Sequence, residues 1–171
     1  MFELQGSLKF KIVRIGLILT VVFQLGVLTW KYLGSVWPLW FGEKVILETE
    51  PVDPRSLFRG NYVWLQYAIS DIEGALAKGD FQKGEVAYVT LVPDGEFYRA
   101  ANMVKEKPTG TLFIRGRVTN NFAPYRLDYG IEAFFMPKEK AIKAERTHTQ
   151  ATIYLLSNGK AAIADLTTED P

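Results

Sequence analysis

The hydrophobic pattern divides the chain into two unlike parts. From Ile12 to Leu33 the residues are apolar apart from Arg14, Gln24, Lys31 and some threonines. About 22 residues at 1.5 Å each cover roughly the 30 Å hydrocarbon core of a bilayer. Beyond this run, apolar and polar positions alternate in short segments. The pattern therefore predicts one transmembrane helix within residues 1–41, followed by a separate β domain over residues 42–171.

The flanks of the apolar run predict its orientation. Lys9, Lys11 and Arg14 lie at its start and Lys31 alone at its end, and cytoplasmic flanks carry the excess of basic residues. We therefore expect a cytoplasmic N-terminus and an extracytoplasmic domain, in the periplasm or on the cell surface. The large residues from Leu28 to Tyr32 do not suit cleavage, so we expect an uncleaved anchor, with a cleaved signal peptide as the alternative. Aromatic residues that favour the headgroup layer follow the run: Trp30, Tyr32, Trp37, Trp40 and Phe41.

One face of the predicted span carries small or polar residues. Gly16, Thr20 and Gln24 follow one another at intervals of four, which suits close packing against a second helix. The alternative is that Gln24 is a single tolerated amide. The sequence leaves helix association open.

The remaining chain predicts a mainly β fold, an antiparallel sandwich or barrel. Two hairpin turns are indicated, at Pro93-Asp94-Gly95 and at Asn158-Gly159. Two short helices are expected, over 71–77 behind a Ser70 cap and over 138–146. The expected strands cover residues 44–49, 62–69, 85–92, 96–101, 111–119, 125–137, 151–156 and 160–166.

Three of these strands carry further expectations. Both faces of the segment from Tyr62 to Ile69 are partly apolar, so it is expected to be a central strand. Gly116 is expected to mark a β-bulge, and Gly130 a bulge or a close approach of another segment.

Composition excludes several functional classes. The net charge is +1, so nucleic-acid binding has no electrostatic footprint. Cysteine is absent and His148 is the sole histidine, so neither a thiolate zinc site nor an all-histidine site is possible within one chain. No metal and no cofactor are expected. Ser157 and Lys160 have the S-x-x-K spacing of serine acyl enzymes, but they lie at a hairpin tip, whereas that chemistry needs a helix.

Polar and aromatic residues gather around the turn before the segment that begins at Tyr62. They could form a pocket for a carboxylate, a sugar or a peptide terminus. The alternative, which we favour, is that they pair among themselves and fix the fold. The residues concerned are Asp53, Arg55, Arg59, Asn61, Tyr62, Tyr67, Tyr129 and Glu132.

The stretch from Gly60 to Tyr67, Gly-Asn-Tyr-Val-Trp-Leu-Gln-Tyr, resembles the signature of the GDYXXLXY protein family. Asn61 stands where that pattern has aspartate. The blocks Asp53-Pro54-Arg55, 129–135 and 159–162 also resemble recurring parts of the family. The resemblance implies bacterial membrane-anchored proteins with an extracytoplasmic domain, and it implies no established activity.

These observations favour a membrane-anchored binding or accessory domain, whose partner is another membrane protein or an envelope component. The alternative is an envelope-acting hydrolase or transferase with Glu132 as acid or base and Arg59 or Tyr62 holding substrate. A third possibility is a structural spacer near the membrane. Oligomeric state is not indicated by any pattern.

Overall fold

The computed structural model describes residues 2–50, 62–135 and 149–168. The chain divides into two compact units, Met1–Trp37 and Pro38–Pro171. Most of the first unit is a single helix, whereas the second unit is built from strands.

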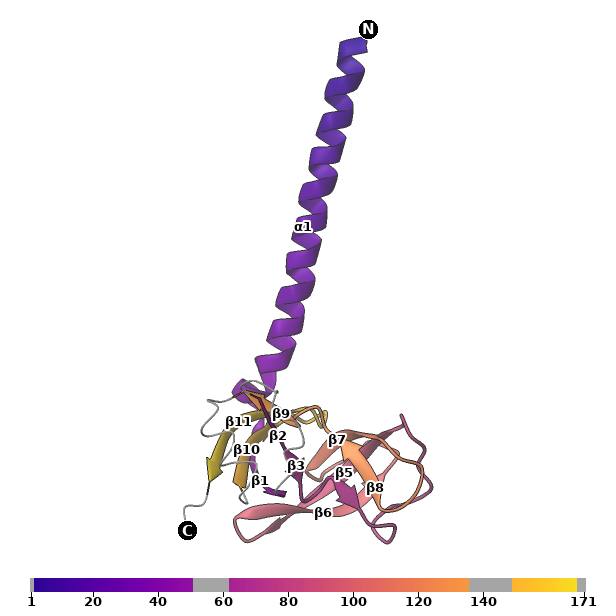
Figure 1. Cartoon of the computed structure of the whole chain (residues 1–171), viewed down its shortest axis with the longest axis vertical. Coiled ribbons are helices and arrows are strands. Elements are labelled where there is room, and N and C mark those ends of the chain that lie inside the picture. Colours follow the sequence, from indigo (N-terminus) through magenta and orange to yellow (C-terminus); the bar gives the residue numbers. More distant parts are fainter. Residues whose placement is uncertain (1, 51–61, 136–148, 169–171) are drawn as a thin grey trace. The chain divides into compact units, whose positions relative to one another are not determined.

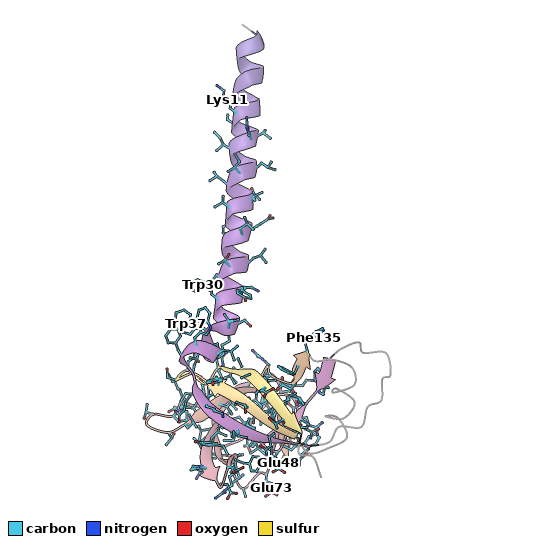
Figure 2. The ribbon with its side chains drawn as sticks, turned by 90° about the vertical axis from the view of Figure 1, so that its left-hand side faces the viewer. Lys11, Trp30, Trp37, Glu48, Glu73 and Phe135 are labelled. Carbon is cyan, nitrogen blue, oxygen red and sulfur yellow. The ribbon has the colours of Figure 1, made fainter. Side chains whose placement is uncertain are left out.

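Helix α1 (Phe2–Phe41) is the single helix of the described chain. Its stretch Lys11–Phe41, 31 residues, is long and apolar enough to cross a membrane. The apolar side chains of this stretch are exposed in every direction around the helix (Figure 2), the pattern of a helix built for an apolar surrounding. The Thr20 hydroxyl donates a hydrogen bond to the Gly16 carbonyl oxygen at 2.9 Å, so this polar group is satisfied within the helix. The prediction of one N-terminal helix of spanning length is confirmed.

The strands form two larger antiparallel sheets and a two-stranded ribbon (Figure 1). The four-stranded sheet has the order β11-β10-β1-β3, and the five-stranded sheet has the order β4-β8-β7-β5-β6. The four-stranded sheet consists of β1 (Glu43–Glu50), β3 (Gln66–Tyr67), β10 (Thr149–Leu155) and β11 (Ala161–Thr168). The five-stranded sheet consists of β4 (Asp71–Ile72), β5 (Val86–Asp94), β6 (Phe97–Val104), β7 (Phe113–Val118) and β8 (Tyr125–Asp128). The ribbon pairs β2 (Tyr62–Trp64) with β9 (Ala133–Phe135).

Both sheets bury alternate residues in one shared core. Val45 of β1 and Ile153 of β10 meet Val89 of β5 and Ile114 of β7 in a single hydrophobic cluster, and all four are fully buried. Strand β1 also packs against β6 of the other sheet. This arrangement confirms the predicted mainly β, antiparallel architecture.

The two predicted hairpins are confirmed. Strands β5 and β6 pair as far as Asp94 opposite Phe97, and β10 and β11 pair as far as Leu155 opposite Ala161. Each turn places a glycine, Gly95 or Gly159, at positive φ, where glycine adopts the backbone without strain. Ser157 and Lys160 therefore lie at a hairpin turn.

The prediction of one central strand over 62–69 is wrong. The segment is interrupted at Leu65, where the backbone N–H donates to the Glu132 carbonyl oxygen at 2.7 Å. Before this point β2 pairs with β9, and after it β3 pairs with β1 at the edge of the four-stranded sheet. The segment thus passes from one partner to another. The predicted strand over 125–137 likewise divides into β8 and β9.

The helix predicted over 71–77 is also wrong, because Asp71 and Ile72 pair with Arg126 and Tyr125 as strand β4. Residues further along bond to β6: Met103 donates its N–H to the Leu76 carbonyl oxygen. Long-range pairing has overridden a local capping signal. The helix predicted over 138–146 and His148 lie outside the described residues.

Gly116 does not form the predicted bulge, since β7 keeps an unbroken register with β5 through this position. A Cβ at Gly116 would lie 2.9 Å from two ring carbons of Tyr129. The glycine therefore makes room for a tyrosine ring. Gly130 has a φ of +81° in the connection between β8 and β9, with open space around it, so there it serves a turn.

Candidate functional site

Two segments far apart in the sequence, 65–70 and 127–132, are joined by hydrogen bonds along their length. At one end Leu65 donates its N–H to Glu132, and at the other end Leu127 donates its N–H to the Ser70 carbonyl oxygen at 2.8 Å. Between these backbone bonds lie two buried tyrosines, Tyr67 and Tyr129. The arrangement brings three of the predicted site residues, Tyr67, Tyr129 and Glu132, into one region.

The two tyrosines bond reciprocally across the segments, and we call this pair the tyrosine lock. The Tyr67 hydroxyl donates to the Ile131 carbonyl oxygen at 2.6 Å. The Tyr129 hydroxyl donates to the Ile69 carbonyl oxygen. Each hydroxyl satisfies a buried backbone acceptor that would otherwise cost about 1–3 kcal/mol. The lock therefore joins the two segments by direct hydrogen bonds.

Burial, and then the negative charge of Glu132, raise the pKa of the Tyr67 hydroxyl far above its usual 10.0. The same two causes, in the same order, raise the pKa of Tyr129 well above that value. Both phenols consequently remain protonated throughout the physiological pH range. They act as fixed hydrogen-bond donors, and neither is suited to accept a proton in catalysis.

Glu132 stabilises the turn at Tyr129 and Gly130, which lies between β8 and β9. One carboxylate oxygen accepts the N–H of Tyr129, and the other accepts the N–H of Gly130 at 2.9 Å. Its side chain is half-buried. This geometry gives Glu132 a structural task, because its carboxylate fixes the backbone of the turn at Tyr129 and Gly130.

A second polar network lies on the outside of the same strands. Asp71 accepts two hydrogen bonds from the Arg126 guanidinium, at 2.9 and 3.0 Å, and one from the Gln66 amide at 3.0 Å. The paired carboxylate raises the pKa of Arg126. The network connects β3, β4 and β8 at their exposed surface, where ion pairs stabilise little.

The remaining predicted site residues are placed only in part. Tyr62 lies in β2, where its backbone pairs with Phe135, and its side chain is outside the description. Asp53, Arg55, Arg59 and Asn61 lie outside the described residues. The predicted convergence of Arg59 with Glu132 therefore stays a prediction, as does the enzyme alternative that depends on it.

Sequence reasoning noted that both faces of the segment around Trp64 are partly apolar, but it did not place Phe135 on the same face of the β2–β9 ribbon as Trp64. Trp64 is 49% exposed and Phe135 is 62% exposed. Trp64 pairs with Ala133, and Phe135 lies two residues beyond Ala133, so both rings are on one face of the ribbon. Figure 2 shows Phe135 at the outer end of this ribbon, away from Glu48 and Glu73. The sequence did indicate the exposure of Trp64, because Trp64 precedes Leu65 and Tyr67, which alternate along the segment and are buried.

The surface hollows in the described part of the β domain include one of about 670 Å³ and one of about 630 Å³. Neither is lined by Tyr67, Tyr129 or Glu132. Both border the connection between β6 and β7, and Lys107 lines both. Among the described residues, no group of three or more His, Asp or Glu side chains is suited to hold a metal ion.

The stretch 60–67 can now be interpreted position by position. Leu65 and Tyr67, which match named positions of the GDYXXLXY pattern, are 3% and 1% exposed. Trp64, which occupies one of its unspecified positions, lies at the surface. The pattern thus combines buried residues that fix the fold with outer residues that are free to vary in chemistry.

Comparison of the chain with known proteins identifies its family. No curated protein and no solved structure matches the chain. Residues 24–166, which include the end of α1 and nearly all of the β domain, match the GDYXXLXY protein family. A match over this much of the sequence shows that the chain belongs to the GDYXXLXY protein family.

Proposed function

We propose that the protein is a single-pass membrane-anchored accessory protein, whose extracytoplasmic β domain binds another membrane or envelope protein through the outer face of the β2–β9 ribbon. The observation that carries the proposal is the exposure of two large aromatic rings, Trp64 and Phe135, on one face of this ribbon. Exposed aromatic residues are enriched where proteins bind one another.

The position of the ribbon supports this choice. Leu65 N–H and the tyrosine lock fix the strand ends behind the ribbon, so the outer rings are presented on a rigid base. A preorganised aromatic surface loses less conformational entropy when it binds. Phe134, on the opposite face, packs against the core, whereas Trp64 and Phe135 remain 49% and 62% exposed to solvent.

The proposal is tested by recovering the full-length chain from detergent-solubilised membranes and identifying the copurifying proteins. The variant carries Trp64→Ser and Phe135→Ser. The matched control is Phe122→Ser, which removes an aromatic ring that is 71% exposed on a loop outside the ribbon. We expect one or a few membrane or envelope proteins to be recovered with wild type and with the control, and to be reduced about tenfold or more with the ribbon variant, as for an interface hot spot.

The same set of proteins with all three chains would show that the ribbon does not bind them. A monomer with no partner in wild type would contradict the accessory role itself. Near-UV circular dichroism of each chain confirms that its β domain is folded before the recoveries are compared.

The orientation is tested separately, because the chain lacks cysteine. A single Lys83→Cys substitution places a thiol on an exposed turn of the β domain, and Ser7→Cys places one before the apolar run. A membrane-impermeant maleimide added to intact cells should label the first chain and not the second. Labelling of the second chain alone would reverse the proposed orientation.

A further inference from the structure

The larger of the two surface hollows, which we call the exit groove, begins where helix α1 ends. Three segments line it: the end of α1 with the start of β1, the connection from β6 to β7, and the end of β10. Its volume is about 670 Å³, within the size range of small-molecule sites. The lining residues used below are Phe41, Glu43, Lys107, Leu112, Phe113 and Leu155.

The groove has an apolar wall and two opposite charges. Phe41, Leu112 and Leu155 contribute apolar surface, whereas Lys107 contributes an ammonium group and Glu43 a carboxylate. The Lys107 nitrogen lies 5.9 Å from the centre of the Phe113 ring, a distance at which the ring attracts the cation. Among the described residues, the ion pairs within 4 Å do not involve Lys107. Its ammonium group therefore has no carboxylate within ion-pair distance in the described part of the chain.

The length of the helix indicates what surrounds this groove. The stretch Lys11–Phe41 has 31 residues, and at 1.5 Å per residue it measures about 46 Å. A bilayer measures about 40–45 Å when both headgroup layers are included. A helix of this length reaches from one headgroup layer to the other. Phe41 is the last residue of this stretch and Glu43 comes two residues later, so these two residues of the groove are tied by the chain to the end of the span.

We propose that the exit groove binds the phosphate-bearing headgroup of a membrane phospholipid; this inference rests on the membrane anchoring in the proposed function. Lys107 pairs with the phosphate, as an ammonium group does in other phosphate sites. The apolar wall takes the glycerol and the first methylene groups, and Glu43 favours a headgroup that carries an amine. The groove thereby selects an amphiphile that has a phosphate between an apolar end and a cationic end.

Native mass spectrometry of the full-length chain in detergent tests the site. The delipidated chain is titrated with phosphatidylethanolamine, phosphatidylglycerol, phosphate-free diacylglycerol and inorganic phosphate. We expect one equivalent of phospholipid to bind more tightly than the rest, and phosphatidylethanolamine more tightly than phosphatidylglycerol. Lys107→Glu should lower the affinity for this phospholipid about tenfold, which is the effect of losing one hydrogen bond to a charged group.

The matched control is Lys83→Glu, which makes the same charge change at an exposed lysine that lines neither hollow, and it should bind as wild type does. Lys107→Gln removes the charge without reversing it and should give an intermediate loss, which guards against misfolding. Equal affinity of wild type and Lys107→Glu would overturn the site. Diacylglycerol binding as tightly as phospholipid would exclude the phosphate contact, and inorganic phosphate binding as tightly would exclude the lipid.

Alkaline extraction of membranes separates failure of this inference from failure of the proposed function. Release of the chain into the soluble fraction would contradict the anchor, and with it both proposals. A chain that stays in the membrane but binds phospholipid independently of Lys107 would contradict the exit groove alone, and would leave the accessory role of the ribbon intact.

Discussion

Trp64 and Tyr67 lie in one stretch of chain, yet their surroundings are opposite. Tyr67 is 1% exposed and bonds to the segment around Ile131, whereas Trp64 is 49% exposed on the ribbon. The inner residues hold the fold together, whereas our proposal assigns binding to the outer residues. If the proposal is correct, substitutions at these two kinds of position should separate stability from binding.

The largest effect on the inner side is expected from Tyr129→Ala. The substitution removes a buried ring that packs against Gly116 and Leu127, and it leaves the Ile69 carbonyl oxygen without its donor. The free energy of unfolding should fall by about 3–5 kcal/mol, as for other aromatic-to-alanine changes in cores. Guanidinium unfolding of the full-length chain in detergent, followed by near-UV circular dichroism, measures it.

Phe122→Ala provides the control for this comparison, because it removes an aromatic ring at a site that is 71% exposed. Its cost should stay within about 0.5 kcal/mol, the usual range for surface changes. Equal costs for the two substitutions would contradict the division between inner and outer residues.

The next largest effect is expected from alkaline pH, which should lower the stability that Tyr67 and Tyr129 contribute. The pKa values of Tyr67 and Tyr129 are raised in the folded chain above the 10.0 of an exposed tyrosine. Their contribution to stability is complete below pH 10, and it is lost as the pH rises, because the unfolded chain then releases protons that the folded chain retains. Each tyrosine should lower the free energy of unfolding by about 1.4 kcal/mol for each pH unit above pH 10.

This pH dependence is measured by guanidinium unfolding at several pH values between 9 and 11.5, roughly the window in which an exposed tyrosine ionises. Tyr67→Phe should reduce the slope by one tyrosine's share, whereas Lys83→Gln should not alter the slope contributed by the lock. An unchanged slope in Tyr67→Phe would mean that this phenol ionises equally in the folded and unfolded chains.

Gly116→Ala should cost less, about 1–3 kcal/mol, through overpacking. The new methyl group would lie 2.9 Å from the ring of Tyr129 and 3.0 Å from Leu127. Combining it with Tyr129→Leu should give a loss smaller than the sum of the two single losses, because the smaller side chain relieves the overlap. Additive losses in the unfolding measurement would show that the two positions do not press on one another.

The smallest effect on stability is expected from Trp64→Ser on the outer side. Its free energy of unfolding should lie within about 0.5 kcal/mol of wild type, while recovery of the proposed partner falls. A large loss of stability in the same unfolding assay would show that Trp64 belongs to the inner set, and the comparison between the two faces would fail.

Local signals in the sequence predicted the elements that depend on neighbouring residues. Asn158-Gly159 and Asp94-Gly95 encode their own turns, so the two hairpins follow from a few residues each. The apolar run that ends at Leu33 likewise predicts the helix without any knowledge of the remaining chain.

Elements that depend on a distant partner could not be predicted in the same way. The interruption at Leu65 exists because its N–H bonds to Glu132, and nothing near Leu65 indicates this. The segment after Ser70 has a helix signal, yet Asp71 and Ile72 pair with β8. A glycine inside a strand predicts a bulge, but Gly116 instead makes room for the ring of Tyr129. Nothing near Gly116 in the sequence indicates that contact. Of the candidate site, sequence grouped Tyr67, Tyr129 and Glu132 together, but their hydrogen-bond roles required the coordinates.

The pairing of β1 with β10 also imposes a delay during biosynthesis, because the two strands are far apart in the sequence. Thr49 and its partner Thr149 are 100 positions apart, and a ribosome adds about 5–20 residues per second. The first strand therefore waits roughly 5–20 s after its own synthesis before its main partner exists. The partners in the tyrosine lock are 64 and 60 positions apart, so all of them have been made before β10 exists. During biosynthesis the domain must keep an apolar strand from premature association until Thr149–Leu155 has been made.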